Sequence, residues 1–209
     1  MATRKIGVGI MGLHDLLIKL GLRYDSLEGR RHSARLMAFI AEQVEYATSE
    51  LGREKGNFPL WERSSFSASK QPRRNASCLT IAPTGTISIL AGVEGYGIEP
   101  IFAVAYRRTY LQEGQPHRLN VFSPLFLAAC KKQGVEAAVL HEAANRGTCQ
   151  EVEGIPASIQ RLFKGAREID AYDHLGMQVA LQKWVDNAIS KTINLPASTP
   201  ASTISDLYQ

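Results

Sequence analysis

The chain has 209 residues, of which 44% are hydrophobic and 21% are charged. This composition is ordinary for a folded globular protein and excludes intrinsic disorder. The length allows one sizeable core or two small ones, and we expect a single domain over residues 1–209. The formal charge is a modest +4, and the basic residues fall in short groups rather than in one stripe. This pattern favours small anions over nucleic acid as ligands.

Three cysteines, Cys78, Cys130 and Cys149, have neither metal-ligand nor disulfide-framework spacing. Their odd count suits a reducing compartment. No apolar run reaches the ~18 residues that a membrane span needs, and no charged-then-apolar leader opens the chain. We therefore expect a cytoplasmic protein with no membrane partner.

Near the amino end, Gly7–Gly12 contains the pattern G-x-G-x-x-G of dinucleotide-binding proteins. That fingerprint needs a complete strand before its first glycine, and only six residues precede Gly7. We therefore reject a dinucleotide site. Apolar residues recur at three- and four-residue intervals from Ile6 to Leu20, which predicts a helix with closely packed glycines. A second, longer helix is predicted after Asp25 or Ser26 as its N-cap, ending at Gly52 or Gly56.

The central stretch, Arg74–Ser88, predicts a strand that leads into an anion-binding turn. Residues 76–82 are mostly apolar, as in a strand buried on both faces, and Pro83 ends the strand. Thr84, Gly85, Thr86 and Ser88 then offer hydroxyls and unobstructed backbone N–H groups to an anion. No lysine follows the glycine, so this is not a Walker A loop. The turn fits equally well an ordinary polar connection between a strand and a helix.

A glycine-rich loop follows and ends in Gly97-Ile98-Glu99-Pro100. Glu99 could contact a ribose hydroxyl or accept from a neighbouring backbone N–H, and we favour the structural role. We predict a strand over residues 101–106 and a polar loop over residues 110–117.

In the C-terminal third, Ser123-Pro124 is expected to open a helix that ends at Gly134. Further helices are predicted over residues 136–146, 156–163 and 172–189, and a short strand over residues 190–196. Ser202 should cap a last helix. The five histidines lack metal-ligand spacing, so we expect no metal site. His174 is interpreted as a hydrogen-bonded structural group rather than a catalyst.

Four stretches, in this order, resemble the adenosylcobalamin-dependent (class II) ribonucleotide reductases: Arg4–Gly12, Arg74–Ser88, Gly97–Ala103 and Asp186–Pro196. The resemblance implies an α/β fold, a helix-rich partial barrel that is a C-terminal piece of the family's ten-stranded α/β barrel. It implies that the turn binds the phosphates of a ribonucleotide substrate, through Pro83, Thr84, Gly85, Thr86, Ile87 and Ser88. Candidate pocket residues beside the turn are Arg74, Asn75, Gly97, Ile98 and Glu99. The loop Val93–Tyr96 departs from the family's small residues, and the bulky Tyr96 would narrow the pocket.

The resemblance also implies what this chain lacks. The family's radical cysteine, its pair of reducing cysteines, and its loop asparagine and glutamate belong to earlier parts of the full enzyme. Cys78, Cys130 and Cys149 stand in other contexts, so we assign no catalytic residue. Adenosylcobalamin is expected in the complete enzyme and is not expected to bind this chain tightly.

We accordingly expect a part of a vitamin B12-dependent reductase that makes deoxyribonucleotides for DNA synthesis and is inactive alone. Its partner would be the upstream half of the catalytic subunit, or a second copy of the chain. Two alternatives remain: a stand-alone module that binds a nucleotide or another phosphorylated ligand, and a structural partner with a vestigial turn.

Overall fold

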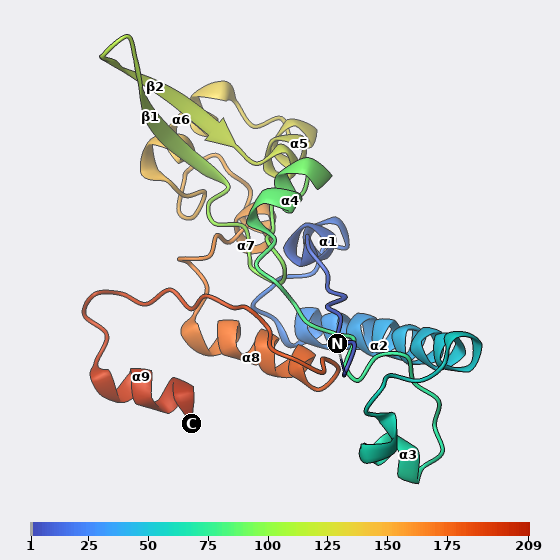
Figure 1. Ribbon diagram of the computed structural model, residues 1–209. Coiled ribbons are helices and arrows are strands. Elements are labelled where there is room, and N and C mark those ends of the chain that lie inside the picture. Colours follow the sequence, from blue (N-terminus) through green and yellow to red (C-terminus); the bar gives the residue numbers. More distant parts are fainter. Residues whose placement is uncertain (1) are drawn as a thin grey trace.

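The computed structural model describes residues 2–209 as a helix-rich molecule with one small sheet (Figure 1). A turn of 3-10 helix, Trp61–Arg63, precedes α3. The helices and strands are α1 Leu13–Lys19, α2 Leu27–Lys55, α3 Ser65–Ala68, α4 Gly85–Ala91, β1 Ala105–Gln112, β2 Gln115–Phe122, α5 Pro124–Lys132, α6 Ala137–Arg146, α7 Ala157–Leu162, α8 Ala171–Gln182 and α9 Ala201–Tyr208.

Three extended segments, residues 4–9, 76–82 and 187–190, lie side by side and form what we call the parallel row. Parallel bridges join Val8 to Leu79 and Ile81 to Ile189. Further hydrogen bonds along the row run from Val8 N to Cys78 O (2.7 Å), Thr80 N to Val8 O (3.0 Å), Ile81 N to Ala188 O (3.2 Å) and Ser190 N to Ile81 O (2.9 Å). The predicted central strand is therefore present as an extended, bridge-paired segment.

The predicted helix from Ile6 to Leu20 is wrong in its first half. Only α1 is helical, and residues 4–9 are extended in the parallel row. The glycines explain the difference, because a Cβ on Gly7 would lie 2.5 Å from Thr80 Cγ2 and one on Gly9 would lie 2.4 Å from Thr80 O. These two glycines allow close approach of two extended segments, not close packing of helices.

The predicted strand at 101–106 is correct only in its last two residues, and the predicted loop at 110–117 is correct only at the turn, Glu113-Gly114. The segment forms an antiparallel hairpin of β1 and β2, in which Ala105 pairs with Phe122 and Gln112 with Gln115. Its two-residue turn is Glu113-Gly114, and both residues have positive φ values, 52° and 78°. Such a turn matches the twist of a hairpin. The hairpin projects away from the long helices (Figure 1).

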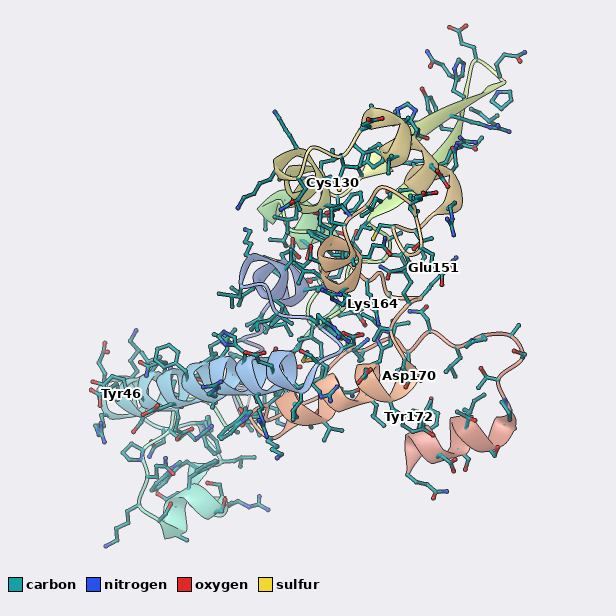
Figure 2. The ribbon with its side chains drawn as sticks, turned by 180° about the vertical axis from the view of Figure 1, so that it is seen from behind. Tyr46, Cys130, Glu151, Lys164, Asp170 and Tyr172 are labelled. Carbon is teal, nitrogen blue, oxygen red and sulfur yellow. The ribbon has the colours of Figure 1, made fainter. Side chains whose placement is uncertain are left out.

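The other helices follow local sequence signals. Ser26 caps α2, because its side chain accepts from Gly29 N, and Ser123 caps α5 by accepting from Phe126 N. Asp170, at the start of α8 in Figure 2, accepts from Tyr172 N. However, α8 ends at Gln182 rather than at residue 189, since the chain there turns into the parallel row. The last helix begins after Pro200 rather than at Ser202.

Two hydrophobic clusters form the core. One lies around Phe126, Phe163 and the segment that leads into β1, while the other joins α1, α2, α8 and the parallel row. Helix α1 contributes to both, through Ile18 to the first and Leu17 to the second. Helices α2 and α8 pack side by side (Figure 1). No helix among the described residues is long and apolar enough to cross a membrane.

Candidate functional site

The predicted turn, Pro83–Ser88, leaves the parallel row at the carboxyl edge of the central segment. Two other loops meet it there. Gly97 N donates to Thr84 Oγ1 at 2.7 Å, and Thr192 N donates to a carboxylate oxygen of Glu99. The structure thus brings together three stretches that are distant in sequence, and three of the candidate residues, Gly97, Ile98 and Glu99, lie beside the turn.

The backbone of the turn has its left-handed residue just before the glycine. The left-handed residue is Thr84, with φ 57° and ψ 19°, whereas Gly85 is the first residue of α4 and has helical geometry. A Cβ on Gly85 would meet no atom within 4 Å. The backbone conformation at position 85 therefore does not require a glycine. The open space above it is the feature that a ligand could use.

Backbone N–H groups provide the donors of the turn. The first helical bond of α4 runs from Ser88 N to Thr84 O, at 2.9 Å. Within the described residues, the N–H groups of Gly85, Thr86 and Ile87 have no hydrogen-bond acceptor, as expected for the first N–H groups of a helix. Successive free N–H groups beside a glycine form a concavity that suits an anion.

The three hydroxyls of the turn have different roles. Thr84 Oγ1 accepts from Gly97 N and lies 3.0 Å from Ser88 Oγ. Ser88 is fully buried, and its hydroxyl also contacts the sulfur of Met11 at 3.6 Å. Thr86 is exposed to solvent, whereas Thr84 is partly buried. Thr84 and Ser88 therefore hold the turn in place, and Thr86 is the hydroxyl that is free to contact a ligand.

The glycine loop is fixed by a buried carboxylate that the sequence did not suggest. Asp15 of α1 accepts from Glu94 N at 2.9 Å and from Gly95 N at 2.7 Å. A Cβ on Gly95 would lie 2.9 Å from Asp15 Oδ2, and a Cβ on Gly97 would lie 2.8 Å from Ala82 O. Both positions require glycine because other backbone or carboxylate atoms approach so closely.

A buried charge network lies next to this loop. The Lys191 ammonium donates to Glu99 Oε2 at 2.5 Å and contacts His174 Nδ1 at 2.8 Å. A lysine has no acceptor, so Nδ1 accepts and Nε2 carries the proton that is donated to Ala166 O at 2.9 Å. Burial lowers the pKa of Lys191, against the opposing effect of Glu99. Burial, followed by the charge of Lys191, also lowers the pKa of His174.

These contacts favour the structural roles expected for Glu99 and His174. Glu99 accepts from a backbone N–H and from a buried ammonium, so both carboxylate oxygens have partners. Sequence reasoning could not pair Lys191 with Glu99, because 92 residues separate them.

His14 and Tyr24 lie beneath the same loop. His14 Nδ1 accepts from Ile101 N at 2.9 Å, while its buried Nε2 has no hydrogen-bond partner in the described structure. Burial lowers the pKa of His14 to about 4. Tyr24 donates to Ile98 O at 2.8 Å, and its ring meets the ring of His14 edge-on. Both residues are uncharged near neutral pH and support the loop from its buried side.

A cleft of about 720 Å³ opens beside the turn. Its wall includes Ile89 of α4, the loop residues Tyr96 and Glu99, and Thr192 and Asn194 after the parallel row. Tyr96 lines the cleft and is 43% exposed. It therefore lies where its bulky side chain was expected to narrow the pocket. The wall of the cleft is largely apolar, and Ile89, the residue after Ser88, connects it to the turn.

Arg74 and Asn75 belong to the opposite end of the central segment. Nine residue steps separate Arg74 from Pro83, and they span roughly 30 Å when extended. Arg74 donates to Lys55 O and Gly56 O, at the end of α2. Asn75 donates to Arg4 O at 2.7 Å. Both side chains therefore hold the scaffold together, and the structure does not bring them to the turn.

All three cysteines are free and buried. Burial raises the pKa of Cys78, that of Cys130 to about 11 and that of Cys149 to about 12. Cys130 lies on α5 (Figure 2) and is fully buried. Such thiols are poor nucleophiles, because the thiolate is the reactive form. The absence of a catalytic role for them stays a prediction.

Three parallel segments with helices around them, and an N–H-lined turn at their carboxyl edge, define an α/β architecture with a candidate anion-binding turn. The family model described as "Ribonucleotide reductase, barrel domain" matches residues 1–72 and 66–209. The chain therefore belongs to the ribonucleotide reductase barrel-domain family, as the sequence resemblance implied.

Sequence relatives agree with this family assignment. The chain is 41% identical over 208 residues to a vitamin B12-dependent ribonucleoside-diphosphate reductase of Mycobacterium tuberculosis (strain CDC 1551 / Oshkosh), with 99% of this chain and 29% of the relative covered. It is 36% identical to the enzyme of the same name in Thermoplasma acidophilum, covering 99% of the chain and 26% of that relative. The chain thus spans less than a third of these relatives and matches their C-terminal part.

A solved structure confirms the fold class. The Actinobacillus ureae class Id ribonucleotide reductase alpha subunit superposes with a TM-score of 0.78 at 23% identity, over 99% of this chain and 36% of that subunit. The expected helix-rich partial barrel is therefore correct.

Proposed function

We propose that this chain supplies the substrate-phosphate turn of a vitamin B12-dependent ribonucleotide reductase. The observation that carries the proposal is the row of free N–H groups at Gly85, Thr86 and Ile87, next to open space and a cleft. A substrate diphosphate or triphosphate would accept from these groups and from the Thr86 hydroxyl. The names of the relatives support a ribonucleotide as the substrate.

In this proposal, the chain binds and orients the substrate but does not reduce it. Thr84 and Ser88 fix the turn, and Asp15 fixes the loop that carries Glu99. The three buried thiols do not fit thiol–disulfide exchange, since burial raises their pKa values and the thiolate is the reactive form. Adenosylcobalamin would supply the radical in the complete enzyme, and we assign no residue of this chain to hold it.

We further propose that residues 1–209 act as one domain in the cytoplasm, in the pathway to deoxyribonucleotides for DNA synthesis. The sharing of α1 by both hydrophobic clusters supports a single domain. The three free cysteines support a reducing compartment. The partner would be the upstream half of the catalytic subunit, or a second copy of the chain.

A reconstitution experiment tests the proposal. We expect the chain alone, with adenosylcobalamin and a dithiol, to form no deoxyribonucleotide. Activity should appear when a second chain supplies the upstream part of the barrel. Deoxyribonucleotide formation by this chain alone would contradict the assignment of the radical residues to the upstream part. Phosphate binding without any gain of activity in the mixture would favour the stand-alone binding module.

A further inference from the structure

The hairpin of β1 and β2 carries a group of cationic side chains that the proposed turn does not use. Nearly all of its residues are exposed, and it projects from the molecule beside α6 (Figure 1). Helix α6 packs against both strands. Where they meet there is a shallow hollow of about 520 Å³, lined by Arg107, Arg118, Leu119, Asn120, Phe122 and His141.

The register of the hairpin places two arginines on one face. Arg107 pairs with Asn120, and Arg118 pairs with Thr109. Paired residues share a face, and so do residues two apart on a strand. Arg107 and Arg118 are therefore diagonal neighbours, with Cα atoms about 7–8 Å apart. Arg108 is paired with Leu119 and directs its side chain to the other face.

The charges of this pair are not neutralised by the protein. No residue that lines the hollow is acidic, and none of the ion pairs found among the described residues involves Arg107 or Arg118. The acidic residue of α6 next to His141 is Glu142, and its nearest cation is Arg146, at 3.8 Å. Like charges held close together on a sheet face are destabilising. An anion bound between them would remove that cost.

We propose that the hollow between the hairpin and α6 binds a phosphoryl group, at a second site distinct from the Pro83–Ser88 turn. Two guanidinium groups offer forked donors that match phosphate oxygens. The amide of Asn120 and the imidazole of His141 add donors at the rim, and Phe122 forms an apolar floor. Inorganic phosphate and the phosphate of a mononucleotide share this chemistry.

Nuclear magnetic resonance of the full chain tests the site directly. We expect inorganic phosphate to shift the ring signals of His141 and the amide signals of residues 107–120. Arg107→Gln and Arg118→Gln should each weaken this binding about tenfold or more, because each removes a charged hydrogen-bond donor from the site. Parallel titrations with inorganic phosphate and adenosine monophosphate separate the two sources. Tighter binding of the nucleotide would show that its base or ribose also contacts the site.

Arg108→Gln is the matched control, since it removes the same charge from the same strand but from the opposite face. It should leave phosphate binding unchanged. Equal weakening by Arg108→Gln would mean that only general surface charge attracts the anion, and the site would have to be abandoned. The absence of any phosphate-induced shift in the hairpin would also overturn it. Gly85→Val should not change the phosphate-induced shifts of the hairpin signals. Absence of phosphate binding in the hollow can therefore be distinguished from absence of phosphate binding at the Pro83–Ser88 turn.

Discussion

The ammonium of Lys191 lies 2.5 Å from Glu99 Oε2, and the lysine side chain is fully buried. This contact ties the last segment of the parallel row to the loop beside the phosphate turn. A buried charge costs free energy unless it is paired and hydrogen-bonded, and Lys191 has three partners: Glu99, His174 and its neighbour's carbonyl, Thr192 O. The network therefore fixes the geometry of the candidate site.

Lys191→Met should lower the free energy of unfolding by about 3 kcal/mol, because it leaves the Glu99 carboxylate without its cation. The Lys191→Met/Glu99→Gln double variant should recover at least half of that loss, since the amide oxygen can still accept from Thr192 N. Urea unfolding at neutral pH measures both. Equal stability of the double variant and Lys191→Met would show that the unpaired Glu99 carboxylate is not the source of the loss.

The stability of the protein should fall as the pH drops from about 6.5 toward 4. The unfolded chain protonates His14 at its ordinary pKa of ~6.5, whereas burial lowers the pKa in the folded state to about 4. Between these values the unfolded state binds more protons, so acid favours unfolding. The shift of ~2.5 pKa units corresponds to roughly 3 kcal/mol, lost progressively across this window.

His14→Asn checks the source of this pH dependence. Asn Oδ1 can replace Nδ1 as the acceptor for Ile101 N, but it does not titrate. The variant should lose stability at pH 7 and should show a flatter dependence below pH 6.5. His174 is present in both the wild type and His14→Asn, so its contribution to the pH dependence of stability cancels in the comparison. An exposed histidine, His117, serves as the control through His117→Asn, which should keep the wild-type slope. An unchanged slope in His14→Asn would assign the effect to another group.

Gly85→Val tests the phosphate turn. The side chain would enter open space beside the free N–H groups, and Gly85 has helical backbone geometry, so the fold should tolerate it. We expect calorimetric titration with ribonucleoside diphosphates to show weak binding by the wild type and at least tenfold weaker binding by the variant, because the valine excludes the anion. Ala91→Val, at the other end of α4, is the matched control. Equal binding by Gly85→Val and wild type would place the site elsewhere.

Local signals in the sequence correctly predicted several elements. Ser26 caps α2, Ser123-Pro124 opens α5, and residues 76–88 form an extended segment followed by a turn and a helix. Each of these depends on residues within one or two helical turns of each other. Capping and turn chemistry are local, so a single sequence can reveal them.

The errors have non-local causes. Residues 4–9 are extended because their hydrogen-bond partners are in the segment around Leu79, about seventy residues away, and the three- and four-residue spacing of Ile6, Ile10 and Leu13 gave no sign of it. The hairpin was missed because both of its faces are largely exposed, so its strands lack apolar alternation. The Lys191–Glu99 pair depends on the folded arrangement of two distant loops.

Self-association of the isolated chain is the final prediction. The outer members of the parallel row, residues 4–9 and 187–190, each have one neighbouring segment within the described residues, so each leaves an open edge. Ile87, Ile89 and Leu90 of α4 are 51%, 70% and 85% exposed. Open strand edges and exposed groups of large apolar side chains rarely stay uncovered in a monomer. We expect light scattering to show association that rises with concentration, together with binding of a hydrophobic dye.

Ile87→Lys/Leu90→Lys should weaken this association roughly hundredfold, since burying two large aliphatic side chains contributes about 3 kcal/mol or more. Leu20→Lys, at an exposed position just after α1, is the control and should associate like the wild type. An increase in mass on adding the upstream part of the barrel, with loss of dye binding, would identify that part as the natural cover. A strictly monomeric chain that binds no dye would show that these segments close a compact domain of their own, and the stand-alone binding module would then become the better explanation.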